Sequence, residues 1–216
     1  MIIGSENWFD AIVRRLSGPV AAYLAQKRIV TADRISLLGL FLGGLASPAL
    51  VLGDQWLLAT ISFLLGDFAD YVDGDVARAQ GTASNRGDIL DGIIDRYVDA
   101  SILMAMTLNA SGLVGGSASS PVFGAGSWLT VAVGLIAIFG AIMPSYVRAV
   151  ASANGITTPE SIGGRGTRNA IIVIGLALGL PAQGLLLVAF AGNGAALHRL
   201  YVALWSSEGQ DSEGAP

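Results

Sequence analysis

The sequence predicts an all-α, polytopic membrane protein with six transmembrane helices and an N-terminal amphipathic helix at the membrane interface. Of its 216 residues, 53% are hydrophobic and only 13% are charged, about half the charged fraction of a typical soluble domain. The mean hydropathy is +0.63. Apolar stretches approaching the ~20 residues that cross a bilayer as a helix recur along the chain. They cover residues 34–53, 56–79, 88–112, 127–149, 168–181 and 183–204.

Residues 1–29 form a separate N-terminal element in this interpretation. Their apolar residues recur at spacings of three and four, the period of a helix with one apolar face; they are Trp8, Phe9, Ile12, Val13, Leu16, Val20 and Leu24. The charged residues off this stripe argue against a secretory signal; they are Glu6, Asp10, Arg14 and Arg15. We expect a helix that lies in the membrane interface or packs on the protein's own cytoplasmic face, kinked or split at Gly18-Pro19.

The basic residues predict the orientation in the membrane. Under the six-helix arrangement they all fall at or near one side: Arg14, Arg15, Lys27, Arg28, Arg34, Arg78, Arg86, Arg96, Arg148, Arg165, Arg168 and Arg199. The loops of the other side, 53–56, 113–126 and 181–183, contain no basic residue. Because Lys and Arg favour cytoplasmic loops, we expect a multi-pass protein of the cell membrane. Both termini and the acidic region 70–99 then face the cytoplasm.

The remaining segments complete the organisation. Residues 30–205 are expected to form one membrane domain, with an uncharged external loop at 111–127 and a tight turn at 180–183. Residues 206–216 are polar and acidic, which is typical of a disordered tail. Glycines of the first and fourth stretches suit close packing between helices; they are Gly39, Gly43, Gly44, Gly134 and Gly140.

Composition limits the chemistry that is available to the chain. Cysteine is absent and there is one histidine, so disulfides and thiolate metal sites are excluded and a structural zinc site is not expected. The net charge is −4 and the basic residues are scattered, which gives no indication of nucleic acid as a partner. Any metal ion must therefore be held by oxygen atoms.

The most unusual feature is a concentration of aspartates inside an apolar chain. Half of the sixteen acidic residues lie between positions 67 and 99. Spacings of three and four place Asp67, Asp70 and Asp73 on one helix face, and Asp88, Asp91, Asp95 and Asp99 on another. An unpaired Asp at the bilayer centre costs about 2.5–3.5 kcal/mol on insertion scales. Positive charge must therefore lie between the two acidic faces.

Carboxylates in this number indicate a hard divalent cation. Oxygen-only ligand sets suit Mg²⁺, Mn²⁺ or Ca²⁺, and two adjacent ions would leave open positions for a phosphoryl oxygen, as in-line displacement requires. Gly74 and Gly87 remove side chains where a bulky ligand could approach the backbone, and Arg78 offers a charge for phosphate. The pattern points to phosphoryl chemistry at the membrane surface.

These residues resemble the complete signature of the CDP-alcohol phosphotransferase family. The signature is Asp70-x-x-Asp73-Gly74-x-x-Ala77-Arg78, then eight residues, then Gly87-x-x-x-Asp91-x-x-x-Asp95. The resemblance implies that an alcohol hydroxyl attacks the phosphoryl group of a CDP-linked lipid, such as CDP-diacylglycerol or CDP-archaeol, and expels CMP. It also implies a homodimer in the lipid bilayer.

The resemblance assigns roles to the aspartates and their neighbours. It implies that two ions, Mg²⁺ or Mn²⁺, are held by Asp70, Asp73, Asp91 and Asp95, and that Asp95 also takes the proton of the attacking hydroxyl. It places the nucleotide contacts on Asp70, Gly74, Ala77, Arg78 and Gly87. Asp67, one turn earlier, could extend the nucleotide site. Asp75, Asp88 and Asp99 lie outside the signature and are expected to be solvated or to support the ligands.

Three arginines are the candidates for binding the acceptor alcohol. Arg148 closes the fourth apolar stretch, and Arg165 and Arg168 open the fifth, so all three should meet at the cytoplasmic mouth. They would hold a phosphorylated acceptor through bidentate contacts, or they simply anchor the helices at lipid headgroups. The run Ser145-Tyr146-Val147-Arg148-Ala149 followed by Arg-x-x-Arg is similar to the branch that makes phosphatidylinositol phosphate or archaetidylinositol phosphate from inositol phosphate.

Alternatives remain for the acceptor alcohol and for the class of protein. Gly164 and Thr167 stand where that branch would carry glutamates, so glycerol 3-phosphate is the second candidate acceptor and serine the third. Intramembrane aspartates also occur in transporters of divalent cations or protons. Transporter aspartates are expected near the middle of several helices, whereas these lie on one helix pair at one side, so an enzyme is favoured.

Overall fold

The computed structural model describes residues 8–27, 30–114, 128–158 and 164–213, and all regular structure in these ranges is helical. A helix α1 (Trp8–Lys27) is followed by α2 (Ala32–Gly39), a π-helical segment η1 (Leu40–Ala46) and α3 (Ser47–Leu52). Next come α4 (Trp56–Gln80), α5 (Asn85–Ser111), α6 (Trp128–Ala153), α7 (Arg165–Ala177) and α8 (Pro181–Glu213). The all-α prediction is confirmed for the described residues.

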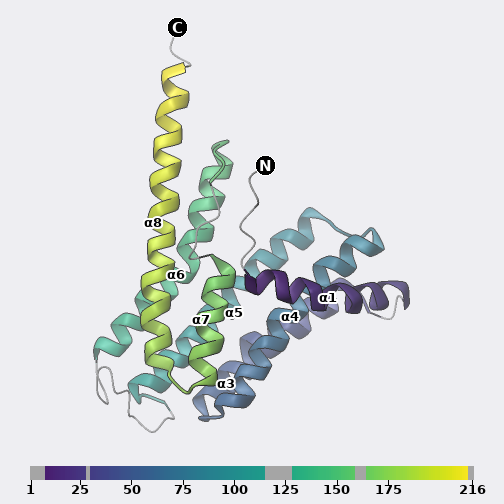
Figure 1. The fold of residues 1–216 in the computed structure, drawn as a ribbon, viewed down its shortest axis with the longest axis vertical. Coiled ribbons are helices and arrows are strands. Elements are labelled where there is room, and N and C mark those ends of the chain that lie inside the picture. The colour runs from purple at the N-terminus through teal and green to yellow at the C-terminus, as the bar shows by residue number, and fades with distance from the viewer. Residues whose placement is uncertain (1–7, 28–29, 115–127, 159–163, 214–216) are drawn as a thin grey trace.

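Helices α2, η1 and α3 follow one another without a break, so six helical rods correspond to the six predicted apolar stretches. Three of them are long and apolar enough to cross a membrane: Ala32–Leu52, Trp128–Ala153 and Pro181–Ser206. Rods α4 and α5 carry the aspartates. Helix α7 has 13 residues and ends before Gly179, which has a φ of 63°. The tight turn predicted at 180–183 therefore lies about two residues earlier, at 178–180, because Pro181 already begins α8. Figure 1 shows α7 beside the much longer α8.

The interior of the bundle is built around α5. Its fully buried Ile102, Leu103 and Met106 pack with residues of α3, α4, α6, α7 and α8 in one apolar cluster. Many large apolar side chains on the outside are exposed; the exposed fraction of Phe190 is 85%. An apolar exterior of this kind suits contact with lipid rather than with water.

Helix α1 crosses the bundle and packs on α4 (Figure 1). It buries Ser17 and Ala21, whereas Leu16 and Val20 of the predicted apolar stripe are exposed. The helix is continuous through Pro19, so it is not split as the sequence suggested. A proline removes one backbone hydrogen bond, and the packing on α4 compensates for that loss.

Glycines let several rods approach closely. A Cβ on Gly66 of α4 would lie 2.6 Å from the backbone nitrogen of Gly43 in η1, and one on Gly140 of α6 would lie 3.1 Å from the backbone nitrogen of Asn193 in α8. The predicted packing role of Gly43 and Gly140 is therefore confirmed. The crossing at Gly66 matters for function because Asp67 is the next residue.

Two predictions concern the ends of elements. Helix α8 continues to Glu213, into the segment 206–216 that the sequence predicts as a disordered tail. A helix that is already nucleated adds each further residue at little cost, which explains this extension. Most of the predicted external loop, residues 115–127, lies outside the described residues.

Candidate active site

The turn between α4 and α5 brings the two acidic faces together. Gly81 ends α4 in the left-handed conformation, with a φ of 68°. Ser84 then caps α5 by accepting a hydrogen bond from the backbone N–H of Gly87 at 3.2 Å. The chain therefore reverses, and the last turns of α4 face the first turns of α5 across an open cavity.

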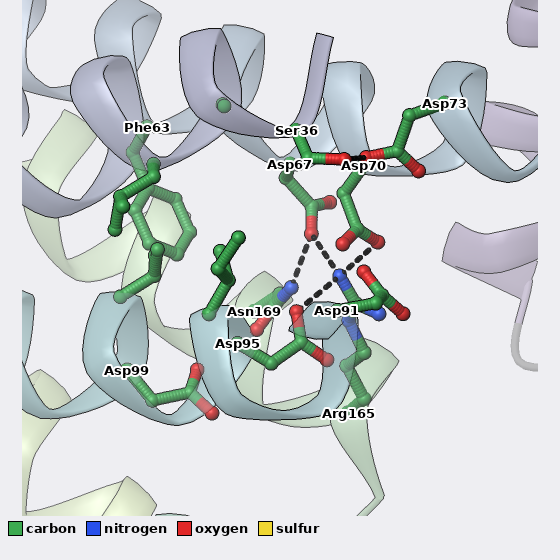
Figure 2. A pocket seen from close by; sticks show the side chains of 15 residues that line it. Ser36, Phe63, Asp67, Asp70, Asp73, Asp91, Asp95, Asp99, Arg165 and Asn169 are labelled. Atoms are coloured by element: carbon green, nitrogen blue, oxygen red, sulfur yellow. Dashed lines mark hydrogen bonds and ion pairs between the residues drawn. The ribbon is translucent and has the colours of Figure 1, made fainter. Parts of the chain in front are cut away.

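Three of the four predicted metal ligands converge. Asp70 of α4 and Asp91 and Asp95 of α5 each offer a carboxylate oxygen, and these oxygens lie within 4.8 Å of one another. Asp73 is turned to the hydroxyl of Ser36 on α2, which donates a hydrogen bond to its carboxylate. Figure 2 shows Asp73 apart from the other three.

The donor set fits a hard divalent cation. All three ligands are carboxylates, which Mg²⁺ and Mn²⁺ prefer. The Oδ1 atom of Asp91 is buried and accepts no hydrogen bond from the described residues. A buried carboxylate oxygen is costly without a partner, so this atom suits a metal ligand.

Arg165, the first residue of α7, lies at the centre of the aspartates. Its Nη2 atom forms ion pairs with Asp70, with Asp95 Oδ1 at 3.1 Å and with Asp67 Oδ1 at 3.6 Å. Figure 2 shows the guanidinium pointing between these carboxylates. It is the positive charge expected between the acidic faces, whereas the sequence analysis considered Arg165 as a candidate for binding the acceptor alcohol.

Asp67 is buried beside this centre and is held by two partners. Besides the ion pair with Arg165, its Oδ1 accepts a hydrogen bond from Asn169 Nδ2 at 2.6 Å. Asn169 lies one turn after Arg165 on α7, so both side chains project from one face of that helix. Asp67 lines the small pocket among the aspartates rather than the larger cavity described below.

A second ionic group lies deeper, between α5, α6 and α7. Asp99 is 4% exposed and pairs with Arg168 Nη2 at 2.8 Å and with Arg96 Nη2 at 3.7 Å. Both arginines also donate to the backbone oxygen of Ala141 on α6, Arg168 at 3.2 Å. Arg96 further pairs with Asp95 at 3.2 Å, which connects the two groups. Asp99 is thus not solvated, since α7 supplies its partner.

An open cavity of about 470 Å³ adjoins the aspartates, within the size range of small-molecule sites. Its lining includes five of the six predicted nucleotide-binding residues: Asp70, Gly74, Ala77, Arg78 and Gly87. Arg78 is largely exposed at the rim and pairs with Asp75 at 2.6 Å. Arg165 lines both this cavity and the aspartate pocket, so it stands at their boundary.

The three predicted acceptor arginines are not brought together. Arg165 reaches the aspartates, Arg168 is buried against Asp99, and Arg148 is exposed on α6. Arg148 lies on the turn after Pro144, whose backbone oxygen accepts a hydrogen bond from the buried Arg199 at 2.9 Å. The sequence predicts one side of the membrane for these arginines, but it does not indicate how deeply each one is buried.

Sequence reasoning did not identify Ser36, Arg96 or Asn169 as parts of the site. Asn169 could have been found, because it follows Arg165 at the helical spacing of four. Arg96 could have been noticed between Asp95 and Asp99. Nothing in the local sequence indicates that Ser36 would meet Asp73, which lies 37 residues later.

Comparison with known proteins agrees with this geometry. Residues 29–205 match the family model described as CDP-alcohol phosphatidyltransferase. The chain is 34% identical over 175 residues to the archaetidylinositol phosphate synthase of Pyrococcus horikoshii, covering 81% of this chain and 84% of that one. It is 33% identical over 175 residues to the bifunctional IPC transferase and DIPP synthase of Rubrobacter xylanophilus, where the match covers 79% of this chain but only 36% of the relative.

The fold also matches solved structures of the phosphatidylinositol phosphate synthase of Mycobacterium tuberculosis. The form with CDP-DAG bound has a TM-score of 0.72 at 21% identity, covering 88% of this chain and 94% of that one. The complex with manganese and citrate has a TM-score of 0.73 at 20% identity, covering 87% and 88%. The family match excludes the transporter considered above. The chain therefore belongs to the CDP-alcohol phosphatidyltransferase family of enzymes.

Proposed function

We propose that this enzyme moves the phosphatidyl-type group of a CDP-linked lipid onto inositol phosphate and releases CMP. The main support for this reaction is that Asp70, Asp91 and Asp95 converge at the end of a cavity of nucleotide size. The acceptor is supported by relatives whose names specify inositol phosphate lipids. The donor is supported by the related fold that was solved with CDP-DAG.

In this proposal Asp70, Asp73, Asp91 and Asp95 hold two divalent ions, Mg²⁺ or Mn²⁺. When bound, such ions polarise the phosphoryl oxygens and stabilise the leaving CMP. Asp73 would take part with a carboxylate that also accepts a hydrogen bond from Ser36. The manganese complex of the related fold supports the type of ion.

The chain's own residues position the two substrates. Asp95 accepts the proton of the attacking hydroxyl, and its carboxylate is paired with Arg96. Gly74 and Gly87 leave room for the nucleotide in the cavity, and Arg78 at its rim provides a charge for phosphate. Ala77 and Asp70 line the same wall, while Asp67 supports the site through Asn169 and Arg165.

The acceptor phosphate is bound by arginines. Of the three candidates Arg148, Arg165 and Arg168, we assign this role to Arg165, because it is the one that lines the cavity. A guanidinium binds phosphate through two parallel hydrogen bonds, which a lysine cannot form. The chain has a single lysine, Lys27, so arginine is the available choice.

We further propose that residues 30–205 form six transmembrane spans in the cell membrane, with the site open to the cytoplasm. Residues 1–29 lie at the membrane interface, 206–216 form the tail, and two chains form a homodimer. The exposed apolar exterior and the one-sided basic residues support the membrane arrangement. A lipid donor then enters from the bilayer and a soluble acceptor from the cytosol.

The test is metal-dependent CMP release by the purified full-length chain. CDP-diacylglycerol or CDP-archaeol is supplied with Mg²⁺ or Mn²⁺, and inositol phosphate, glycerol 3-phosphate, inositol and serine are offered in parallel. We expect turnover with inositol phosphate alone, abolished in Asp95→Asn. Asp54→Asn, at the opposite end of α4, is the matched control and should retain activity. Turnover with another acceptor would refute the inositol assignment, and no CMP release with any acceptor would refute the reaction.

A further inference from the structure

We infer that Arg165 is an internal counter-ion for the aspartates, and that it must leave them when a divalent ion binds. This inference rests on the proposed function, because it concerns the metal site of that reaction. It gives Arg165 a role before catalysis, in addition to the role toward the acceptor proposed above.

The first support is that the guanidinium and the candidate metal site use the same residues. The cluster that could hold an ion consists of Asp70, Asp91 and Asp95. Two of these three, Asp70 and Asp95, are ion-paired to the same nitrogen of Arg165. A Mg²⁺ ion that binds these carboxylates at about 2.0–2.1 Å would occupy the space among them that this nitrogen fills. The two cations compete for one position.

The second support is the balance of charge around the site. Asp67, Asp70 and Asp95 all contact Arg165, and in the described structure no other basic side chain reaches Asp67 or Asp70. Without Arg165, these buried carboxylates would repel one another at short range. The arginine therefore keeps the ligands close together until an ion replaces it. A cation in the same place would repel the guanidinium, so both cannot remain.

The third support is that the side chain of Arg165 has open space beside it into which it can move. Its side chain stands at the boundary between the aspartate pocket and the open cavity, and it lines both. The ring of Tyr71 lies 5.6 Å from the guanidinium carbon, within the range of a cation–π contact. Rotation of the side chain toward the cavity moves its charge from the metal position to the substrate position. Helix α7 can stay in place during this rotation, because Arg168 still pairs with Asp99 and Asn169 still donates to Asp67.

A direct measurement of metal binding tests this inference. Mn²⁺ is titrated into the purified full-length chain without lipid or acceptor, and free Mn²⁺ is followed by electron paramagnetic resonance. Because Arg165→Gln removes the competing cation, we expect its Mn²⁺ affinity to rise by about tenfold or more. Arg34→Gln, an exposed arginine that lines neither cavity, is the matched control for net charge and should match the wild type.

Arg165→Lys provides a second variant that keeps the charge. Lysine offers one compact ammonium on a flexible stem and is held less rigidly, so the affinity should lie between those of the wild type and Arg165→Gln. This variant decides the question if Arg165→Gln does not fold. An unchanged or weaker affinity in the variants, with Mn²⁺ binding and CMP release intact in the wild type, would overturn the counter-ion role alone. A wild type that binds no Mn²⁺ and releases no CMP would overturn the proposed function as well.

Discussion

Replacing Gly66 by alanine tests how closely the site depends on helix packing. An ideal Cβ on Gly66 would lie 2.6 Å from Gly43 N, 2.8 Å from Gly43 Cα and 3.0 Å from Gly39 O. Ordinary contacts between carbon atoms are about 3.5–4.0 Å. Helix α4 and segment η1 must therefore separate by roughly 1 Å, and Asp67, the next residue, moves with α4.

The size of the effect follows from that displacement. Overpacking of a well-packed contact costs about 1–3 kcal/mol, and the better helix propensity of alanine returns up to about 1 kcal/mol. A net loss of up to about 2 kcal/mol should lower the midpoint of thermal unfolding. A 1 Å misplacement of catalytic groups can cost roughly a hundredfold in rate, so we expect CMP release by Gly66→Ala to fall by about 10- to 100-fold.

Thermal unfolding, followed by fluorescence of the four tryptophans, and CMP release are the two assays. Gly92→Ala is the matched control, because Gly92 is the neighbour of Asp91 yet a Cβ there meets nothing within 4 Å. This control should be as stable as the wild type or more so, with normal turnover. If Gly66→Ala unfolded and turned over like Gly92→Ala, the close crossing of α4 and η1 would not position the aspartates.

Three further predictions follow from the contacts of the site. Asp99→Asn leaves the buried Arg168 without its carboxylate partner, so the free energy of unfolding should fall by about 3–5 kcal/mol. The double variant Asp99→Asn/Arg168→Gln, which is neutral at both positions, should recover part of this stability. A double variant less stable than the single one would contradict the pairing. Asn169→Ala removes the hydrogen-bond donor to Asp67 and should lower the free energy of unfolding by about 1.5–3 kcal/mol. An unchanged stability would show that this hydrogen bond is absent in solution. Chelation of divalent ions should stop CMP release and added Mn²⁺ should restore it, whereas Asp91→Asn should weaken Mn²⁺ binding; activity that survives chelation would exclude the metal site.

Local spacing predicted those parts of the structure that depend on one helix or on two helices adjacent in sequence. The hydropathy of the chain predicted every rod, and spacings of three and four placed Asp70, Asp91 and Asp95 on facing surfaces. The predicted cavity residues, such as Gly74 and Gly87, also lie on this hairpin. A short turn makes its two helices face each other, here across the open cavity, so their facing residues follow from the sequence alone.

Contacts with α7 and α2 could not be predicted in the same way. The partner of Asp70 is Arg165, 95 residues later, and the partner of Asp73 is Ser36, 37 residues earlier. Such pairings depend on how distant helices pack, which periodicity within each helix does not encode. For the same reason the sequence did not indicate that Arg148 is exposed and Arg168 buried.

The acidic and basic residues of the site lie far apart in the sequence, and this separation affects how the protein folds during synthesis. The aspartates of α4 and α5 leave the ribosome before α7, which carries Arg165 and Arg168. Until α7 docks, an apolar environment penalises those carboxylates by several kcal/mol. The acidic hairpin therefore reaches its buried position only late in biogenesis. A chain that ends before Arg165 lacks the cation that pairs with Asp67, Asp70 and Asp95, so its acidic hairpin should stay in contact with water.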